Sequence, residues 1–117
     1  MKKILVVDDE EEISNVLRHF LTIKGYDVET ASGGLEALEK TPTFGPDLIL
    51  LDIWMKDLDG IETLKKIKSG NPSLKVVMIT AVIDGEYLME ALKSGAEDYI
   101  TKPFQYDYLE ERFARFL

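Results

Sequence analysis

Short apolar runs alternate with amphipathic segments along the chain. Three of these runs are continuously apolar and cover residues 4–7, 48–51 and 76–79. Continuous apolar strands are typical of a parallel sheet that is covered by helices on both faces. Two further segments, 26–30 and 98–101, mix polar with apolar residues, which favours edge strands. The pattern therefore predicts a five-stranded sheet with three inner strands and two edge strands.

The segments between the strands have the spacing of amphipathic helices. The first helix has apolar residues at i, i+3, i+4, i+7 and i+8, so that they form one stripe. These residues are Ile13, Val16, Leu17, Phe20 and Leu21. Gly25 follows at the position of a left-handed C-terminal cap. Leu35 and Leu38 predict a second helix, with Ser32 as its N-cap.

Three more helices follow from the same spacing. Their apolar residues are Ile61, Leu64 and Ile67, then Leu88, Ala91 and Leu92, and finally Leu109, Phe113 and Phe116. The first of these helices ends at Gly70, the second ends at Gly95, and the third begins after Pro103. Strand and helix therefore alternate five times, which predicts an α/β fold of the flavodoxin type over residues 1–117. We expect a single domain with a doubly wound parallel sheet in the order 2-1-3-4-5 and helices on both faces.

Composition and charge exclude several classes of function. The 117 residues are 45% hydrophobic and 31% charged, which is ordinary for a globular protein. A net charge of −8 argues against direct nucleic-acid binding. The chain has no Cys and one His, which excludes disulfides, thiolate sites and clusters of His ligands. No apolar run is long enough for a membrane helix or a signal peptide, so we expect a cytoplasmic protein without membrane association.

Polar residues stand where the predicted strands end. Asp8 and Asp9 follow the first strand, and Asp52 follows the third. Thr80 and Lys102 stand at the ends of the fourth and fifth strands. Ligands of open parallel sheets bind beyond the carboxyl ends of the strands, so we expect these five side chains to converge in one shallow pocket.

The chemistry of this pocket indicates phosphoryl transfer. Neighbouring carboxylates repel one another, and a hard divalent cation such as Mg²⁺ relieves the repulsion while keeping water positions for phosphate oxygens. Lys102 and Thr80 add a positive charge and a hydrogen-bond donor for a second anionic group. Carboxylates attack phosphorus to form aspartyl phosphates. Asp52 is the better candidate acceptor, because it stands alone between Leu51 and Ile53 at the end of a central strand.

At these residues the sequence resembles the receiver domain of bacterial two-component response regulators, the family of the chemotaxis protein CheY. The resemblance covers essentially the whole chain. The matching segments are 4–10, 47–52, 59–60, 79–81 and 102–104. Their order and their places on the predicted elements make the resemblance specific.

The resemblance implies a role for each matched residue. Asp52 would be the phosphoacceptor and a ligand of Mg²⁺ (or Mn²⁺). Asp9 would bind the ion directly, Asp8 would act mainly through water, and the backbone carbonyl of Trp54 would be a further ligand.

The remaining matched residues would bind the phosphoryl group or respond to it. Lys102 would pair with the phosphoryl group, and its bond to Pro103 would be cis. Thr80 would be the switch hydroxyl, and Tyr99 would be the aromatic residue that turns inward with it. The sequence departs from the family pattern at Lys56, where the family usually has a Pro that restricts φ.

The resemblance implies a signalling switch in a phosphorelay. Its phosphodonor would be a phosphohistidine on a sensor histidine kinase or a histidine phosphotransfer protein. Phosphorylation would change the surface formed by the helix at 88–92, the strand at 98–101 and the helix after Pro103, through which we expect a homodimer or a separate protein partner. The domain would catalyse its own phosphorylation and slow dephosphorylation, so it would not be a conventional turnover enzyme.

Three alternatives belong to other classes. A flavodoxin-like carrier would need a phosphate loop where this chain has five acidic residues at 8–12. An Asp-nucleophile phosphatase would need a second acid two residues after Asp52, where Trp54 stands. A receiver-like module that binds partners without phosphorylation is the third alternative. The sequence leaves open whether an output domain follows Leu117 or the domain acts alone.

Overall fold

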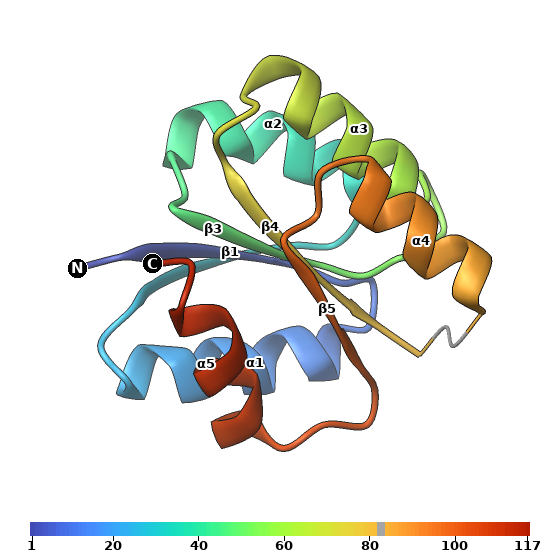
Figure 1. Ribbon diagram of the computed structural model, residues 1–117. Helices are drawn as coiled ribbons and strands as arrows, with labels where there is room; N and C mark the ends of the chain where they lie inside the picture. The colour runs from blue at the N-terminus through green and yellow to red at the C-terminus, as the bar shows by residue number, and fades with distance from the viewer. Residues whose placement is uncertain (82–83) are drawn as a thin grey trace.

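The computed structural model describes residues 1–81 and 84–117, in which strands and helices strictly alternate (Figure 1). The strands are β1 (Lys3–Val7), β2 (Asp27–Ala31), β3 (Leu48–Leu51), β4 (Lys75–Thr80) and β5 (Asp98–Thr101). The helices are α1 (Glu11–Ile23), α2 (Gly34–Phe44), α3 (Gly60–Gly70), α4 (Gly85–Lys93) and α5 (Tyr106–Ala114). In this part of the chain, no helix has both the length and the apolar character that crossing a membrane requires.

The five strands form one parallel sheet in the order β2-β1-β3-β4-β5. Helices α2, α3 and α4 cover one face of the sheet, and α1 and α5 cover the other (Figure 1). The predicted α/β fold, its strand order and its two helical layers are therefore confirmed.

The continuous apolar runs are explained by the two cores on either side of the sheet. Successive side chains of a strand point to opposite faces. In β1, Leu5 and Val7 contribute to the core under α2, α3 and α4, while Ile4 and Val6 contribute to the core under α1 and α5. The inner strands β3 and β4 divide their side chains in the same way. All of these positions must therefore be apolar.

Three residues of the predicted apolar helix faces are exposed in the structure: Val16, Leu35 and Leu92. The buried face of α1 is formed by Ser14, Leu17 and Leu21, which places Val16 on the solvent-facing flank of the helix. The buried hydroxyl of Ser14 is satisfied because it donates a hydrogen bond to the backbone oxygen of Asp8. Leu35 is also exposed, at the first turn of α2.

Each predicted strand end lies within one residue of the observed one, and two helix ends differ from the prediction. Gly25 and Gly95 have φ values of 99° and 109°, which fits their prediction as helix-terminating residues. Ser32 does not cap α2, because the N-cap position is Gly33. The backbone N–H and hydroxyl of Ser32 both donate to the Glu36 carboxylate instead. Phe116, predicted within the last helix, lies beyond the end of α5.

Candidate functional site

Two buried carboxylates lie side by side where the adjacent strands β1 and β3 end. Asp8 and Asp52 each follow directly after their strand, and their backbone N–H groups donate to the last residues of neighbouring strands, Ala31 and Val7. The sheet hydrogen bonding thus continues one residue beyond each strand and fixes both positions. Asp8 is 3% exposed and Asp52 is 5% exposed.

Lys102 brings a positive charge to both carboxylates from the end of β5. Its Nζ lies 2.8 Å from Oδ2 of Asp8 and 3.3 Å from Oδ2 of Asp52. The backbone N–H of Lys102 donates to the backbone oxygen of Thr80 at 2.8 Å, and the Lys102–Pro103 peptide bond is cis. The convergence predicted for Asp8, Asp52 and Lys102 is therefore seen in the structure.

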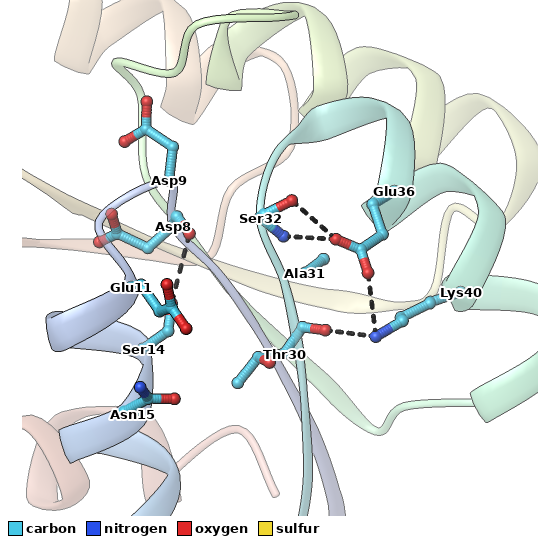
Figure 2. Close-up of a pocket in the computed structure, with 10 residues that line it drawn as sticks. All are labelled: Asp8, Asp9, Glu11, Ser14, Asn15, Thr30, Ala31, Ser32, Glu36 and Lys40. Atoms are coloured by element: carbon cyan, nitrogen blue, oxygen red, sulfur yellow. Dashed lines mark hydrogen bonds and ion pairs between the residues drawn. The ribbon is translucent and has the colours of Figure 1, made fainter.

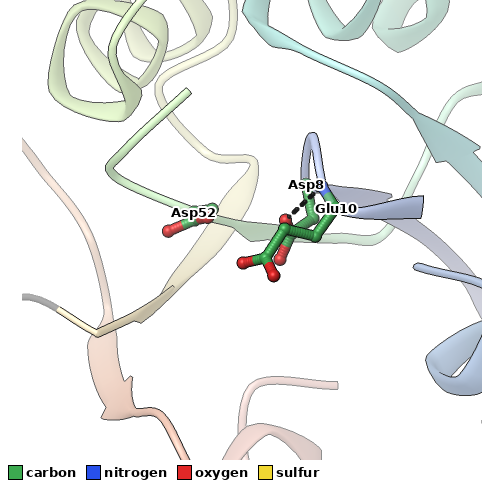
Figure 3. Close-up of side chains that lie close together, drawn as sticks. All are labelled: Asp8, Glu10 and Asp52. Carbon is green, nitrogen blue, oxygen red and sulfur yellow. Dashed lines mark hydrogen bonds between the residues drawn. The ribbon is translucent and has the colours of Figure 1, made fainter. Parts of the chain in front are cut away.

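A third carboxylate completes the cluster, and it belongs to Glu10. Ligand oxygens of Asp8, Glu10 and Asp52 all lie within 4.8 Å of one another (Figure 3). The exposed Glu10 side chain lies 3.5 Å from the ammonium of Lys102, and its backbone N–H donates to Oδ1 of Asp8. Three carboxylates with a single ammonium form an oxygen-rich, anionic donor set, which fits a hard divalent cation.

Asp9 is not part of this group of three carboxylates. Figure 2 shows its side chain pointing a different way from that of Asp8, at the rim of a hollow of about 370 Å³ between α1 and the β2–α2 segment. The resemblance implied Asp8, Asp9, Asp52 and the Trp54 carbonyl as metal ligands, and it did not include Glu10. The sequence feature that could have pointed to Glu10 is its position directly after Asp8 and Asp9.

Burial and charge pairing together set the pKa values in the site. Desolvation raises the pKa of Asp52 to about 6; the positive charge of Lys102 opposes this shift, and the negative charge of Asp8 adds to it. Burial works to lower the pKa of Lys102, but the hydrogen bond to Asp8 and the charge of Asp52 outweigh it, and the pKa is raised. At neutral pH the site therefore holds a charged ammonium between carboxylates that together exceed its charge, which favours an additional cation.

The other predicted site residues lie on β4, on β5 and in the segment between β3 and α3. Thr80 is fully buried at the end of β4, the strand between β3 and β5. Tyr99 on β5 is half-buried against the core under α2, α3 and α4. Trp54 is exposed, and its ring packs edge-on against that of Tyr87 with centroids 5.2 Å apart. Lys56 is exposed in the same β3–α3 segment.

The fold is a doubly wound α/β domain with an acidic pocket at the carboxyl ends of its strands, and comparison with known proteins identifies the family. The chain belongs to the response regulator receiver domain family, whose family model matches residues 4–114. The resemblance seen in the sequence is therefore confirmed, and the acidic pocket of Asp8, Glu10 and Asp52 fits the phosphoacceptor site of such domains.

Curated relatives and solved structures agree with this assignment. The chain is 48% identical to the alkaline phosphatase synthesis transcriptional regulatory protein PhoP of Bacillus subtilis, over 88% of this chain and 43% of that protein. It is 49% identical to the transcriptional regulatory protein ZraR of Klebsiella oxytoca, over 92% of this chain and 24% of that protein. The chain thus spans 24% to 43% of the length of these relatives.

Two solved structures match over nearly their whole length. A CheY-like receiver domain protein from Methanospirillum hungatei JF-1 superposes with a TM-score of 0.95 at 34% identity, covering 98% of this chain and 92% of that one. The receiver domain of NtrX from Brucella abortus superposes with a TM-score of 0.91 at 39% identity, covering 97% of each chain.

Proposed function

We propose that residues 1–117 act as a phosphorylation-driven switch in which Asp52 accepts a phosphoryl group from a phosphohistidine. The donor would be a sensor histidine kinase or a histidine phosphotransfer protein. One observation carries the proposal: the Lys102 ammonium lies between the buried carboxylates of Asp8 and Asp52, at the edge of the sheet where parallel α/β folds bind ligands. An ordinary structural ion pair would not need a second buried carboxylate and a third acid beside it.

The proposed transfer is a displacement at phosphorus. A carboxylate oxygen of Asp52 forms the new P–O bond while the P–N bond to the donor histidine breaks. The ring nitrogen leaves with the bonding electron pair. The 3.3 Å contact between Nζ of Lys102 and Oδ2 of Asp52 supports a role for this ammonium as the partner of a phosphoryl oxygen on the modified Asp52. Thr80, on the neighbouring strand, is the proposed hydroxyl partner of that group.

We propose Mg²⁺ (or Mn²⁺) as the cofactor. Asp8 and Asp52 supply buried carboxylate oxygens, and the resemblance adds Asp9 and the backbone carbonyl of Trp54 as ligands. Glu10 already stands beside the first two, so it is a further candidate for contact with the ion or its waters. When bound, a divalent cation offsets the negative charge of the carboxylates and of the incoming phosphoryl group.

The proposed output is a change of the surface formed by α4, β5 and α5. Tyr99 lies on β5 within this surface and is the proposed aromatic switch that follows Thr80. A homodimer through the surface, or a separate protein partner bound to it, would then read the phosphorylation state. A net charge of −8 supports protein partners over direct contact of this domain with nucleic acid.

The test is phosphorylation by acetyl phosphate with Mg²⁺, followed by intact-mass measurement. We expect one added phosphoryl group that maps to Asp52 and is absent from Asp52→Asn and from samples with a chelator. Asp47→Asn is the matched control, because Asp47 is an exposed carboxylate just before β3, at the opposite edge of the sheet. An unmodified wild-type protein, or equal modification of Asp52→Asn, would overturn the proposal.

A further inference from the structure

We propose that Asp57 is a positioning residue for the metal and phosphoryl site, because its carboxylate ties the segment between β3 and α3 to the first turn of α2. This inference rests on the proposed function. The segment, residues 53–59, is here called the acceptor loop; it follows Asp52 directly and contains Trp54, whose backbone carbonyl is a proposed metal ligand.

The Asp57 carboxylate accepts hydrogen bonds from two separate parts of the chain. The backbone N–H of Gly34 donates to Oδ1 at 3.1 Å, and that of Leu35 donates to Oδ2 at 3.0 Å. The backbone N–H of Leu58 donates to Oδ1 at 2.7 Å. These bonds stabilise the charged carboxylate and lower the pKa of Asp57, with the bond from Leu35 contributing most.

The two N–H groups from α2 are ones that the helix itself leaves unsatisfied. The first turn of an α-helix has no intrahelical partners for its N–H groups, and a side chain at the N-cap normally supplies one. In α2 the N-cap is Gly33, which has no side chain to do so. Asp57 takes over this role from the acceptor loop, so the cap of α2 is also a tether of that loop.

Gly33 provides the space for this tether. A Cβ atom at Gly33 would lie 2.5 Å from Oδ1 and 2.7 Å from Oδ2 of Asp57, which is too close for either oxygen to stay in place. The backbone of Gly33 is extended, with φ −176°, and any residue adopts that conformation. The glycine is therefore needed for the approach of Asp57 and not for an unusual backbone.

The hydrogen bonds of Asp57 restrain the middle of the acceptor loop, which the contacts at the two ends of the loop do not hold. One end is fixed because Ile53 is buried and its backbone oxygen accepts from Gly60 at 2.7 Å. The other end is fixed by Asp59, which caps α3 through the N–H of Glu62. Between them, Lys56 leaves φ unrestricted where a Pro would fix it. Asp57 restrains this middle section and hence the Trp54 carbonyl.

The test measures Mg²⁺ affinity in a double-mutant cycle of Asp57→Ala and Gly33→Ala. Trp54 is the only tryptophan, so its fluorescence reports on the acceptor loop during a Mg²⁺ titration, and calorimetry supplies the same constant independently. Each single variant should raise the Kd about 3- to 10-fold, less than the ~10- to 100-fold typical of partners that touch the ligands themselves. The double variant should raise it no further than the larger single effect, since both changes break the same tether.

The control is Asp47→Ala, which removes an exposed carboxylate at the opposite end of the strands. Like Asp57, Asp47 accepts a hydrogen bond from a backbone N–H, in this case that of Lys3. Its Kd should equal that of the wild type. Urea unfolding of each variant shows that titrations are made on folded protein. If Asp57→Ala is unfolded, Asp57→Asn replaces it. This variant keeps one acceptor oxygen, so we expect a smaller rise in Kd that still exceeds about twofold.

The outcomes separate this inference from the proposed function. If the wild type binds Mg²⁺ but Asp57→Ala or its Asn replacement binds it within about twofold as well, the positioning role is wrong. Additive effects of Gly33→Ala and Asp57→Ala would also overturn it, as would an equal effect of Asp47→Ala. If the wild type neither binds Mg²⁺ nor takes a phosphoryl group, the proposed function itself fails.

Discussion

Replacing Asp52 by Asn is expected to stabilise the protein in the absence of metal. Desolvation raises the pKa of Asp52 from 3.8 to about 6, so the folded state binds this proton more tightly than the unfolded state does. The contribution of Asp52 to stability is therefore most favourable below pH 3.8 and is lost as the pH rises through about 6. Asn is neutral at every pH and removes this loss, while its side-chain oxygen still accepts from Lys102.

The magnitude follows from the shift in pKa. Each unit corresponds to about 1.4 kcal/mol, so the gain for Asp52→Asn reaches up to about 3 kcal/mol at pH 7.5. At pH 4.5 the carboxyl group is largely protonated in the folded state and partly protonated in the unfolded state. The expected gain there falls to about 1 kcal/mol.

The assay is urea unfolding of both proteins with a chelator at pH 7.5 and pH 4.5. The control is Asp47→Asn, since Asp47 is exposed and lies at the opposite end of the strands. Its free energy of unfolding should stay within about 0.5 kcal/mol of the wild-type value at both pH values. Added Mg²⁺ should stabilise the wild type by mass action and leave Asp52→Asn nearly unchanged. A variant that is less stable than the wild type at pH 7.5 without metal, or a gain that does not shrink on acidification, would refute the reasoning.

Three further predictions concern the same site. Lys102→Met should cost about 2–4 kcal/mol at pH 7.5, because Asp8 and Asp52 lose their buried counter-charge; urea unfolding measures the loss, and Mg²⁺ should recover part of it. Mg²⁺ affinity measured by calorimetry should fall about tenfold per pH unit below pH 6, where protons compete for Asp52, and stay level above pH 7. Gly60→Ala should cost about 1–3 kcal/mol, because its Cβ would press into the Asp52 backbone oxygen, whereas Gly70→Ala, with open space around it, should be close to neutral.

The fold was predictable because its signals are repeated along the chain. A run such as Leu48–Leu51 must be apolar at every position when both faces of a strand are buried, and that condition leaves few alternatives to a covered parallel sheet. The convergence of Asp8, Asp52 and Lys102 then followed from topology alone. All three stand at carboxyl ends of strands, and because the strands are parallel, those ends lie at the same end of the sheet.

The details that the sequence did not predict depend on the directions in which side chains point from a short loop. Only residues 8–10 separate β1 from α1, and the local turn determines which acids face Asp52. In this turn Glu10 joins Asp8, and Asp9 points elsewhere, so the role of Asp9 at the metal stays a prediction. A rule based on adjacency to the strand end cannot choose between neighbouring acids.

The cap of α2 illustrates a second limit of local patterns. Serine is a favoured N-cap residue and Ser32 stands close to the start of α2, but the N-cap position is Gly33. The helix is capped instead by the carboxylate of Asp57, which is 23 residues away from Gly34 in the sequence. Capping preferences describe neighbours along the chain, whereas the N–H groups of a first turn accept any correctly placed oxygen. The tertiary contact has the larger consequence, because Asp57 also belongs to the acceptor loop. A cap supplied by a residue next to α2 would stabilise only that helix. Because the cap comes from Asp57, the conformation of the acceptor loop beside Asp52 also depends on the position of the first turn of α2.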